Sequence, residues 1–324
     1  MTANKNEIKR ICIYGMGGVG GSFGGRMAHI LNQTDSQFEI YFVARGEHLQ
    51  KIRDGGLLLK STQLGNVVCR PKLAVDDLSE LPQMDLILLC VKGYDLDQAT
   101  EWIARYSNDN TLIIPLLNGV AIDQRIRNIV HKGVVLPGCV YVGGYIEKPG
   151  IVVHSGGDLL IFGLEPCHSA IPEWIFELFN VTGINYKCFD NPYPAIWEKF
   201  IFIAAFGLVT AFADRTIGEV MADEQLCRYV KEIMSEIHLI AKAEKVELKD
   251  SIVEESLIKG KKFPYELKTS LQRDIEQRKK RNELEILGGS IIRLGEKHGI
   301  PTPVTETLYQ YLENIINSPK PDYF

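Results

Sequence analysis

A glycine-rich segment near the start of the chain has the spacing of a phosphate-binding turn. It reads Gly15-Met16-Gly17-Gly18-Val19-Gly20, after a short apolar run and before a predicted helix at about residues 18–31. In a G-x-G-x-x-G turn, Gly15 allows the sharp bend, Gly17 lets the backbone approach a pyrophosphate, and Gly20 lets the helix pack closely on its strand. The N-terminus of the helix offers unpaired N–H groups to the phosphates. A glycine-rich loop without a ligand is the alternative, but this context favours a dinucleotide site.

Arg45 follows the second predicted strand, residues 39–43. An acidic residue at this place would bind the ribose 2′-hydroxyl of NAD, whereas an arginine accommodates the 2′-phosphate of NADP. A charge-assisted contact contributes about 1.5–3 kcal/mol. The sequence therefore predicts NADP(H) as the cofactor, with a surface arginine as the alternative.

Two more polar side chains follow predicted strands. Lys92 comes after the strand at residues 85–91, and Asn118 after the strand at residues 111–116. Ligands of open α/β sheets bind at the carboxyl ends of the strands. Either residue alone could be a solvated lysine or a simple turn, but their occurrence at successive strand ends favours a role in binding.

The second half of the chain offers a lysine and three oxygen-bearing side chains. Lys199 lies in an otherwise apolar helix, Ser270 and Asp274 lie one helical turn apart, and Glu283 begins another predicted helix. A lysine in such surroundings usually extends to the surface. Taken singly, each of these residues is typical of a cap or a surface charge.

The elements that must position these residues form two different patterns. The first half alternates near-continuous apolar strands with helices, one of them at residues 96–106, which predicts a doubly wound, Rossmann-type parallel sheet covered on both faces. The predicted strands after the first lie at residues 39–43, 57–59, 67–69, 85–91, 111–116, 134–142, 151–153 and 159–162. Residues 57–59 and 67–69 are expected to form a hairpin, and residues 155–158 a turn between the last two strands.

Helical periodicity dominates after residues 191–194, where Pro194 suits the first turn of a helix. One predicted helix begins at Pro194. Further helices are predicted at residues 223–245, 283–298 and 305–316. We therefore expect a nucleotide-binding domain at residues 1–190 and an all-helical substrate domain at residues 191–324. A long helical half can serve as a dimer interface, although nothing in the sequence requires a homodimer.

Composition narrows the class of protein. The 324 residues are 45% hydrophobic with a formal net charge of -5 and a pI near 5.9, which argues against a nucleic-acid surface. Seven scattered cysteines without a C-x-x-C pair indicate free thiols in a reducing compartment, and the histidines show no metal-ligand spacing. We expect no signal peptide, because residues 1–5 lead directly into the first predicted strand. The apolar run at residues 200–213 is shorter than the roughly 20 residues that span a bilayer and predicts a buried helix. We expect a cytoplasmic protein without a metal and without a membrane anchor.

The glycine-rich turn, the strand-end residues and the polar residues of the helical half together resemble the ketopantoate reductase family (2-dehydropantoate 2-reductases). This family reduces a branched 2-oxo acid with NADPH for pantothenate biosynthesis. The resemblance covers nearly the whole chain in motif order. It includes the glycine-rich turn, Arg45, Cys90-Val91-Lys92, Leu117-Asn118-Gly119, Trp197-Glu198-Lys199, Ser270-Leu271-Gln272-Arg273-Asp274, Glu283-Leu284-Glu285 and His298-Gly299-Ile300-Pro301-Thr302-Pro303. Compared with the family pattern, this chain has one extra residue between Asp274 and Glu283.

The resemblance implies a role for each matching residue. Lys199 would be the catalytic general acid, Glu283 would assist catalysis and substrate binding, and Ser270 would bind substrate. The implied contacts to NADP(H) are Gly15, Met16, Gly17, Gly18, Val19, Gly20, Arg45, Lys92 and Asn118, and Asn118 would also face the substrate. A protonated lysine could stabilise the oxyanion that grows on a keto oxygen and could donate the proton to it. The helical half would resemble the C-terminal domain of 6-phosphogluconate dehydrogenase.

One departure from the family concerns the substrate. Family members usually carry asparagines four and eight residues after the lysine, on the same helical face, whereas this chain has Ile203 and Gly207. Ile203 would form an apolar wall, Gly207 would leave space, and Thr210 could supply a hydroxyl. The expectation is NADPH-dependent reduction of a 2-oxo acid, either ketopantoate or a different, bulkier one. The alternatives are another 6-phosphogluconate dehydrogenase-like enzyme and a non-catalytic NADP(H) sensor.

Overall fold

The computed structural model describes residues 7–164 and 170–318. The expectation for residues 1–5 and the prediction of a free thiol at Cys167 lie outside these ranges. The chain forms two compact units. One holds the described residues up to 117 and those from 121 to 192, and the other holds residues 118–120 and the described residues from 193 onward.

The first unit is built on a six-stranded sheet in which every strand pair is parallel. Its spatial order is β5-β2-β1-β6-β7-β8. The strands are β1 (Lys9–Tyr14), β2 (Phe38–Val43), β5 (Leu73–Val75), β6 (Leu86–Leu89), β7 (Leu112–Pro115) and β8 (Val134–Val135). The central strands are apolar along their whole length because both faces are covered, and the predicted parallel sheet with helices is confirmed.

A second sheet belongs to the same unit. It consists of β3 (Leu57–Ser61), β4 (Gly65–Cys69), β9 (Gly138–Lys148), β10 (Ile151–Gly163) and β11 (Asn185–Phe189). The predicted hairpin is confirmed, since β3 and β4 pair antiparallel. The helices of this unit are α1 (Gly18–Leu31), α2 (Gly46–Gly55), α3 (Leu96–Tyr106), α4 (Ile122–Arg127) and α5 (Glu173–Val181), with short η1 (Leu78–Glu80) and η2 (Gly93–Asp95).

Two strand predictions are wrong. Residues 151–153 and 159–162 belong to the single strand β10, because β9 pairs with both parts and the glycines between them form bulges instead of a turn. Gly156 and Gly157 have φ of +146° and +70°, which suits such bulges. The predicted strand at residues 134–142 is divided between β8 and β9, because Pro137 between them has no N–H to donate.

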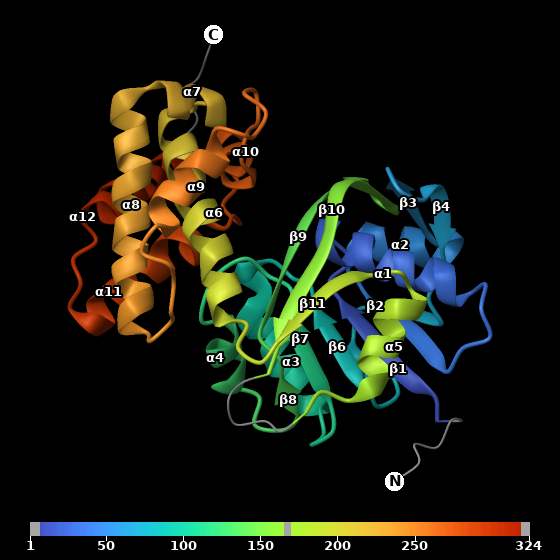
Figure 1. Ribbon diagram of the computed structural model, residues 1–324. Coiled ribbons are helices and arrows are strands. Elements are labelled where there is room, and N and C mark those ends of the chain that lie inside the picture. Colours follow the sequence, from blue (N-terminus) through green and yellow to red (C-terminus); the bar gives the residue numbers. More distant parts are fainter. Residues whose placement is uncertain (1–6, 165–169, 319–324) are drawn as a thin grey trace. The chain divides into compact units, whose positions relative to one another are not determined.

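Helix α1 packs on both sheets through glycines (Figure 1). A Cβ at Gly24 would lie 2.7 Å from Ile13 of β1, whereas a Cβ at Gly21 would lie 2.6 Å from Val152 of β10. A Cβ at Gly18 would lie 2.0 Å from the carbonyl oxygen of Gly144 in β9. The backbone of α1 therefore touches β9 directly, without a side chain between them.

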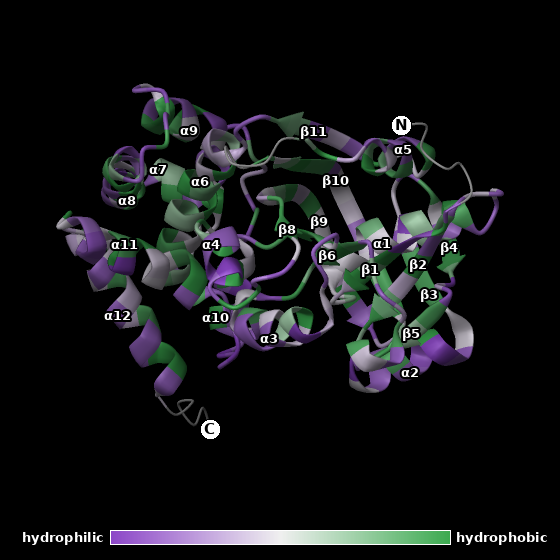
Figure 2. Cartoon of the chain, turned by 90° about the horizontal axis from the view of Figure 1, so that it is seen from below, coloured by the Kyte–Doolittle hydropathy of each residue, from purple (hydrophilic) through white to green (hydrophobic). Residues whose placement is uncertain are grey.

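The second unit is helical in all its described elements. These are α6 (Tyr193–Ala213), α7 (Ile217–Ala222), α8 (Glu224–Ala243), α9 (Ile252–Gly260), α10 (Ser270–Glu276), the π-helical turn η3 (Glu285–Gly289), α11 (Ser290–His298) and α12 (Pro303–Asn317). Green and purple stretches alternate along α12 in Figure 2, as expected of a helix with one buried face. The helical second half is confirmed, although its helix predicted at residues 283–298 begins with one π turn.

Helix α6 contains the apolar run noted in the sequence. It is longer than that run, and its 21 residues make it the one helix among the described residues that is long and apolar enough to cross a membrane. However, 78% of its most apolar window is buried within the protein. Such burial is typical of the core helix of a soluble protein, which confirms the predicted buried helix.

Candidate active site

The glycine-rich turn joins β1 to α1 at the carboxyl edge of the parallel sheet. Gly15 has a φ of +102°, and a Cβ there would lie 3.0 Å from the backbone of Cys90. A Cβ at Gly20 would lie 2.0 Å from the carbonyl oxygen of Gly15. Both glycines are therefore required by the protein itself, for the bend and for the approach of α1 to β1.

Gly17 differs because the space beside it is open. A Cβ added at this residue would meet nothing within 4 Å. Gly17 is also the N-cap of α1, where no side chain caps the helix, and no acidic residue lies in the first turn with Gly18 and Val19. Open space beside unpaired N–H groups and a positive helix end suits a pyrophosphate. The turn thus fits the predicted dinucleotide.

The strands on either side end in register with β1. Tyr14 pairs with Val43 of β2 and with Leu89 of β6, and Leu89 pairs with Pro115 of β7. The residues that follow these strands therefore start from one edge of the sheet. Lys92 is exposed there and is the N-cap of η2.

Arg45 is the N-cap residue of α2 and is half exposed, with 48% of its side chain accessible. Its guanidinium lies 3.3 Å from the Asp95 carboxylate and donates a hydrogen bond of 3.2 Å to Gln98. Burial raises the pKa of Tyr14, and the neighbouring Arg45 lowers it in part. Asp95 and Gln98 hold the arginine at the end of β2, where a ribose 2′-phosphate is expected.

Lys199 and Asn118, two of the predicted site residues, are in contact within the second unit. Lys199 Nζ donates a hydrogen bond of 2.7 Å to Asn118 Oδ1. The lysine is only 7% exposed although it lies on the apolar helix α6. A buried ammonium group is costly unless polar partners hold it, so this position is typical of a functional lysine instead of a surface one.

Ser270 and Glu283 lie on segments that pack against α6. Ser270 is the exposed first residue of α10, and Glu283 is 4% exposed just before η3. Both α10 and η3 contact α6. A π-helical turn of this kind is often found at a functional site.

The two positions that lack asparagine have apolar surroundings. Ile203 is half-buried, and the nearest atoms to a Cβ at Gly207 would belong to Leu287 at 3.5 Å and Leu271 at 3.9 Å. The idea that Thr210 supplies a hydroxyl to a substrate is wrong. Its side chain is fully buried, donates to the Phe206 carbonyl at 2.7 Å and lies 2.8 Å from Thr269 Oγ1.

Two residues were missed in the sequence. Thr269 caps α10 by accepting a hydrogen bond from the Gln272 N–H, and the T-x-x-Q spacing could have indicated it. His48 lies one turn after Arg45 and contacts the glycine-rich turn at Met16. Nothing in the local sequence gives that contact, since the two residues are 32 positions apart.

Two buried cysteines, Cys12 and Cys90, lie close to the glycine-rich turn. All six described cysteines are free thiols. Burial raises the pKa of Cys12 and of Cys90, which lie on β1 and just after β6. Neither thiol is therefore a nucleophile at neutral pH.

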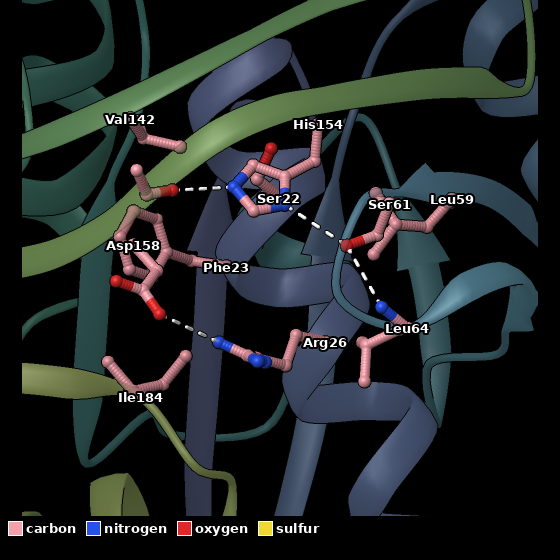
Figure 3. A pocket seen from close by; sticks show the side chains of 11 residues that line it. Ser22, Phe23, Arg26, Leu59, Ser61, Leu64, Val142, His154, Asp158 and Ile184 are labelled. Carbon is pink, nitrogen blue, oxygen red and sulfur yellow. Dashed lines mark hydrogen bonds and ion pairs between the residues drawn. The ribbon is translucent and has the colours of Figure 1, made fainter.

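A small cavity among α1, β3 and β10 is distinct from the nucleotide turn (Figure 3). Its free space of about 10 Å³ is close to the minimum for one water molecule. His154 lies beside it, with Nδ1 3.1 Å from Ser61 Oγ and Nε2 2.5 Å from the Gly157 carbonyl oxygen. The cavity is far too small for a dinucleotide, and the buried Arg26 Nε has no hydrogen-bond partner among the described residues.

Comparison with known proteins matches both halves of the chain to one family. The family model described as "Ketopantoate reductase PanE/ApbA" matches residues 11–166, and its C-terminal counterpart matches residues 192–315. A 2-dehydropantoate 2-reductase of Streptococcus pyogenes serotype M3 is 27% identical over 290 residues, which cover 87% of this chain and 91% of that protein.

Solved structures show the same fold. The PanE/ApbA family ketopantoate reductase of Ralstonia eutropha JMP134 has a TM-score of 0.85 and 26% identity, covering 95% of this chain and 98% of its own. A D-mandelate dehydrogenase, solved with NADH and anilino(oxo)acetate, has a TM-score of 0.82 and 23% identity, covering 95% and 98%. The glycine-rich turn, Arg45 and Lys92 lie within the first matched segment, and Lys199, Ser270 and Glu283 within the second.

Proposed function

The chain belongs to the ketopantoate reductase family, and from this premise we propose that it reduces 2-dehydropantoate to pantoate with NADPH, in pantothenate biosynthesis. Membership makes it an oxidoreductase that acts on CH–OH groups with a pyridine nucleotide. The family reaction is the reduction of a 2-oxo acid. The choice of 2-dehydropantoate, of NADPH and of the residues below is our proposal.

The buried Lys199, hydrogen-bonded to Asn118, is the observation that carries the proposal. A bound nicotinamide supplies the hydride, and negative charge then grows on the keto oxygen of the substrate. We assign to Lys199 the stabilisation of that charge and the donation of the proton. Asn118 orients the ammonium group, because its Oδ1 accepts one of the three Nζ protons.

Two further side chains complete the proposed site. The Ser270 hydroxyl, exposed at the start of α10, is assigned to the substrate carboxylate. Glu283 is buried before η3 and is assigned to a hydroxyl group of the substrate. Both assignments rest on family resemblance and on the packing of α10 and η3 against α6.

Arg45 supports NADPH as the cofactor. Its guanidinium is half exposed at the end of β2 and is held by Asp95 and Gln98, so it needs no new partner to stay in place. A 2′-phosphate would add a third partner, with more negative charge than Asp95.

A second candidate function is the reduction of a bulkier, less polar 2-oxo acid. Ile203 and Gly207 stand where family members usually carry asparagines, so two side-chain amides are absent. The side chains nearest to Gly207 are Leu271 and Leu287. A site that lacks such hydrogen-bond donors discriminates poorly in favour of a hydroxylated substrate. An aryl 2-oxo acid suits this arrangement, and a D-mandelate dehydrogenase is among the proteins of similar fold.

The test is NADPH oxidation with a panel that includes 2-dehydropantoate, branched aliphatic 2-oxo acids and phenylglyoxylate. The variant Lys199→Ala should lower kcat by about 10²–10⁴-fold, as expected for loss of a general acid, and should leave NADPH binding unchanged. Phenylglyoxylate as the best substrate would support the second candidate instead. If the native protein binds NADPH but turns over none of these 2-oxo acids, both candidates fail and the result supports a non-catalytic NADP(H) sensor.

A further inference from the structure

His48 lies in the first part of α2, and both of its ring nitrogens are engaged by backbone groups. Nε2 lies 2.9 Å from the carbonyl oxygen of Met16, in the glycine-rich turn. The N–H of Gly150, in the turn between β9 and β10, donates to Nδ1 at 3.0 Å. One half-buried side chain thus links three segments that are far apart in the sequence.

These partners define the protonation of the ring. A backbone N–H can only donate, so His48 Nδ1 carries no proton, and a carbonyl can only accept, so Nε2 carries one. The imidazole is therefore neutral. A second proton on Nδ1 would point at the Gly150 N–H and would break that contact.

The contact with Met16 determines how the nucleotide turn presents its N–H groups. The Met16 carbonyl and the Gly17 N–H belong to the same planar trans peptide and point in opposite directions. Holding the carbonyl toward His48 therefore directs the Gly17 N–H away from it. Gly17 is the residue beside which a Cβ would meet nothing within 4 Å.

The rest of the turn is held by other contacts. The Gly15 N–H donates to the Val43 carbonyl at 3.0 Å, and the side chain of Met16 is 2% exposed in the core. These contacts hold Gly15 and the Met16 side chain, but neither of them is made by the Met16 carbonyl. The Met16 carbonyl is held by His48, whose Nε2 lies 2.9 Å from its oxygen.

The contact with Gly150 has a different role. Gly150 also accepts a hydrogen bond of 2.9 Å from the Leu58 N–H, and a Cβ there would lie 2.7 Å from Lys51 Cβ. The turn between β9 and β10 therefore stays on α2 and β3 by its own contacts. The two nitrogens of His48 can thus be tested separately.

We propose that His48 is a positioning residue for the dinucleotide, because its Nε2–H holds the Met16–Gly17 peptide in the orientation that offers the Gly17 N–H to the pyrophosphate. The proposal rests on the nucleotide site of the proposed function. It adds a specific residue outside the glycine-rich motif to that site.

Two variants separate the nitrogens. His48→Gln places an amide N–H₂ near the position of Nε2 and keeps the contact with Met16, whereas His48→Asn places an amide oxygen near Nδ1 and keeps the contact with Gly150. The dissociation constant of NADPH is measured by fluorescence titration, and the thermal midpoint is measured without cofactor. His48→Asn should weaken NADPH binding by about 2- to 10-fold, the range of one hydrogen bond, with a midpoint close to that of the native protein. His48→Gln should bind NADPH within about twofold of the native protein.

Three results would overturn the proposal. NADPH affinity equal to native in His48→Asn would show that the Met16 contact is not used. A greater loss in His48→Gln than in His48→Asn, or equal losses that follow the midpoints, would show a merely structural role. If the native protein itself binds neither NADPH nor NADH, the proposed function fails as well, and this outcome differs from all the others.

Discussion

At the scale of single residues, the glycines of the nucleotide turn have different physical reasons to be glycine. Gly20 is required by the folded protein itself, since any Cβ would overlap the Gly15 carbonyl oxygen. Gly17 is not, since the space around it is open and its φ of -75° suits any residue. The protein's own packing therefore does not require glycine at residue 17, and the open space there suits a ligand that approaches the backbone.

This difference predicts opposite effects of two equal substitutions. Gly17→Ala should change the free energy of unfolding without cofactor by no more than about 1 kcal/mol, the size of an N-cap preference, yet should weaken NADPH binding at least tenfold. Gly20→Ala should lower the free energy of unfolding itself, by about 1–3 kcal/mol as for an overpacked contact. Urea unfolding and fluorescence titration measure the two effects. A Gly17→Ala variant with native NADPH affinity would argue against pyrophosphate binding at this turn.

At the scale of elements, one buried carboxylate connects α8 with α12. Pro303 at the start of α12 has no N–H, and Thr302 makes no cap bond to the helix. Glu236 of α8 takes that place, accepting from the N–H groups of Val304 at 2.9 Å and Thr305 at 3.2 Å. The Thr305 hydroxyl also donates to it at 2.5 Å.

Glu236→Gln should therefore destabilise the protein by about 1–3 kcal/mol, because its amide N–H₂ would face one of these donors. Glu232→Gln, one turn earlier on α8 and half-buried, is the matched control and should lie within about 0.5 kcal/mol of the native protein. Urea unfolding monitored by circular dichroism measures both. Equal stability of the two variants would contradict the capping role of Glu236.

The link made by His48 gives α2 a pH dependence. Burial lowers the pKa of His48 below its usual 6.5, an effect that the hydrogen bond to the Met16 carbonyl only partly opposes. The stability that comes from the neutral ring is therefore fully present above about pH 6.5 and is lost as the pH falls through the lowered pKa.

Relative to His48→Gln, which does not titrate, the native protein should lose stability on acidification from pH 7.5 to pH 5. Thermal midpoints of both proteins without cofactor, measured across this range, provide the check. Parallel midpoint curves would show that the ring does not titrate in this window.

At the scale of the whole molecule, binding of a cofactor to the folded state alone must raise the stability of the protein. NADPH at 100 times its dissociation constant should add about 2.7 kcal/mol to the free energy of unfolding. Because Arg45 is the proposed contact to the 2′-phosphate, NADH at the same concentration should add less. In Arg45→Ala the two cofactors should stabilise equally, as measured by thermal unfolding. A persistent preference for NADPH in that variant would place the 2′-phosphate elsewhere.

The sequence predicted the parallel strands well because their burial on both faces makes them continuously apolar. It failed at β5 and β11, since one has three residues and the other is largely exposed. It also failed at β10, where two glycines resemble a turn but form bulges. The position of Arg45 at a strand end could be predicted from the same pattern. The contacts of His48 and Glu236 could not, because their partners are 32 to 102 positions away.

The contact of α1 with two sheets has a consequence for how the protein is made. Five of the 14 residues of α1 are glycine, which costs an isolated helix about 4–5 kcal/mol relative to alanine. The strands that flank it on one side, β9 and β10, are translated more than a hundred residues later. An isolated segment that carries the glycine motif is therefore a poor helix, and α1 depends on its packing against the strands of both sheets for its stability. The contacts of α1 with β9 and β10 can form only after residue 163 has been made, so the packing of the helix that begins at the nucleotide turn is completed late in synthesis.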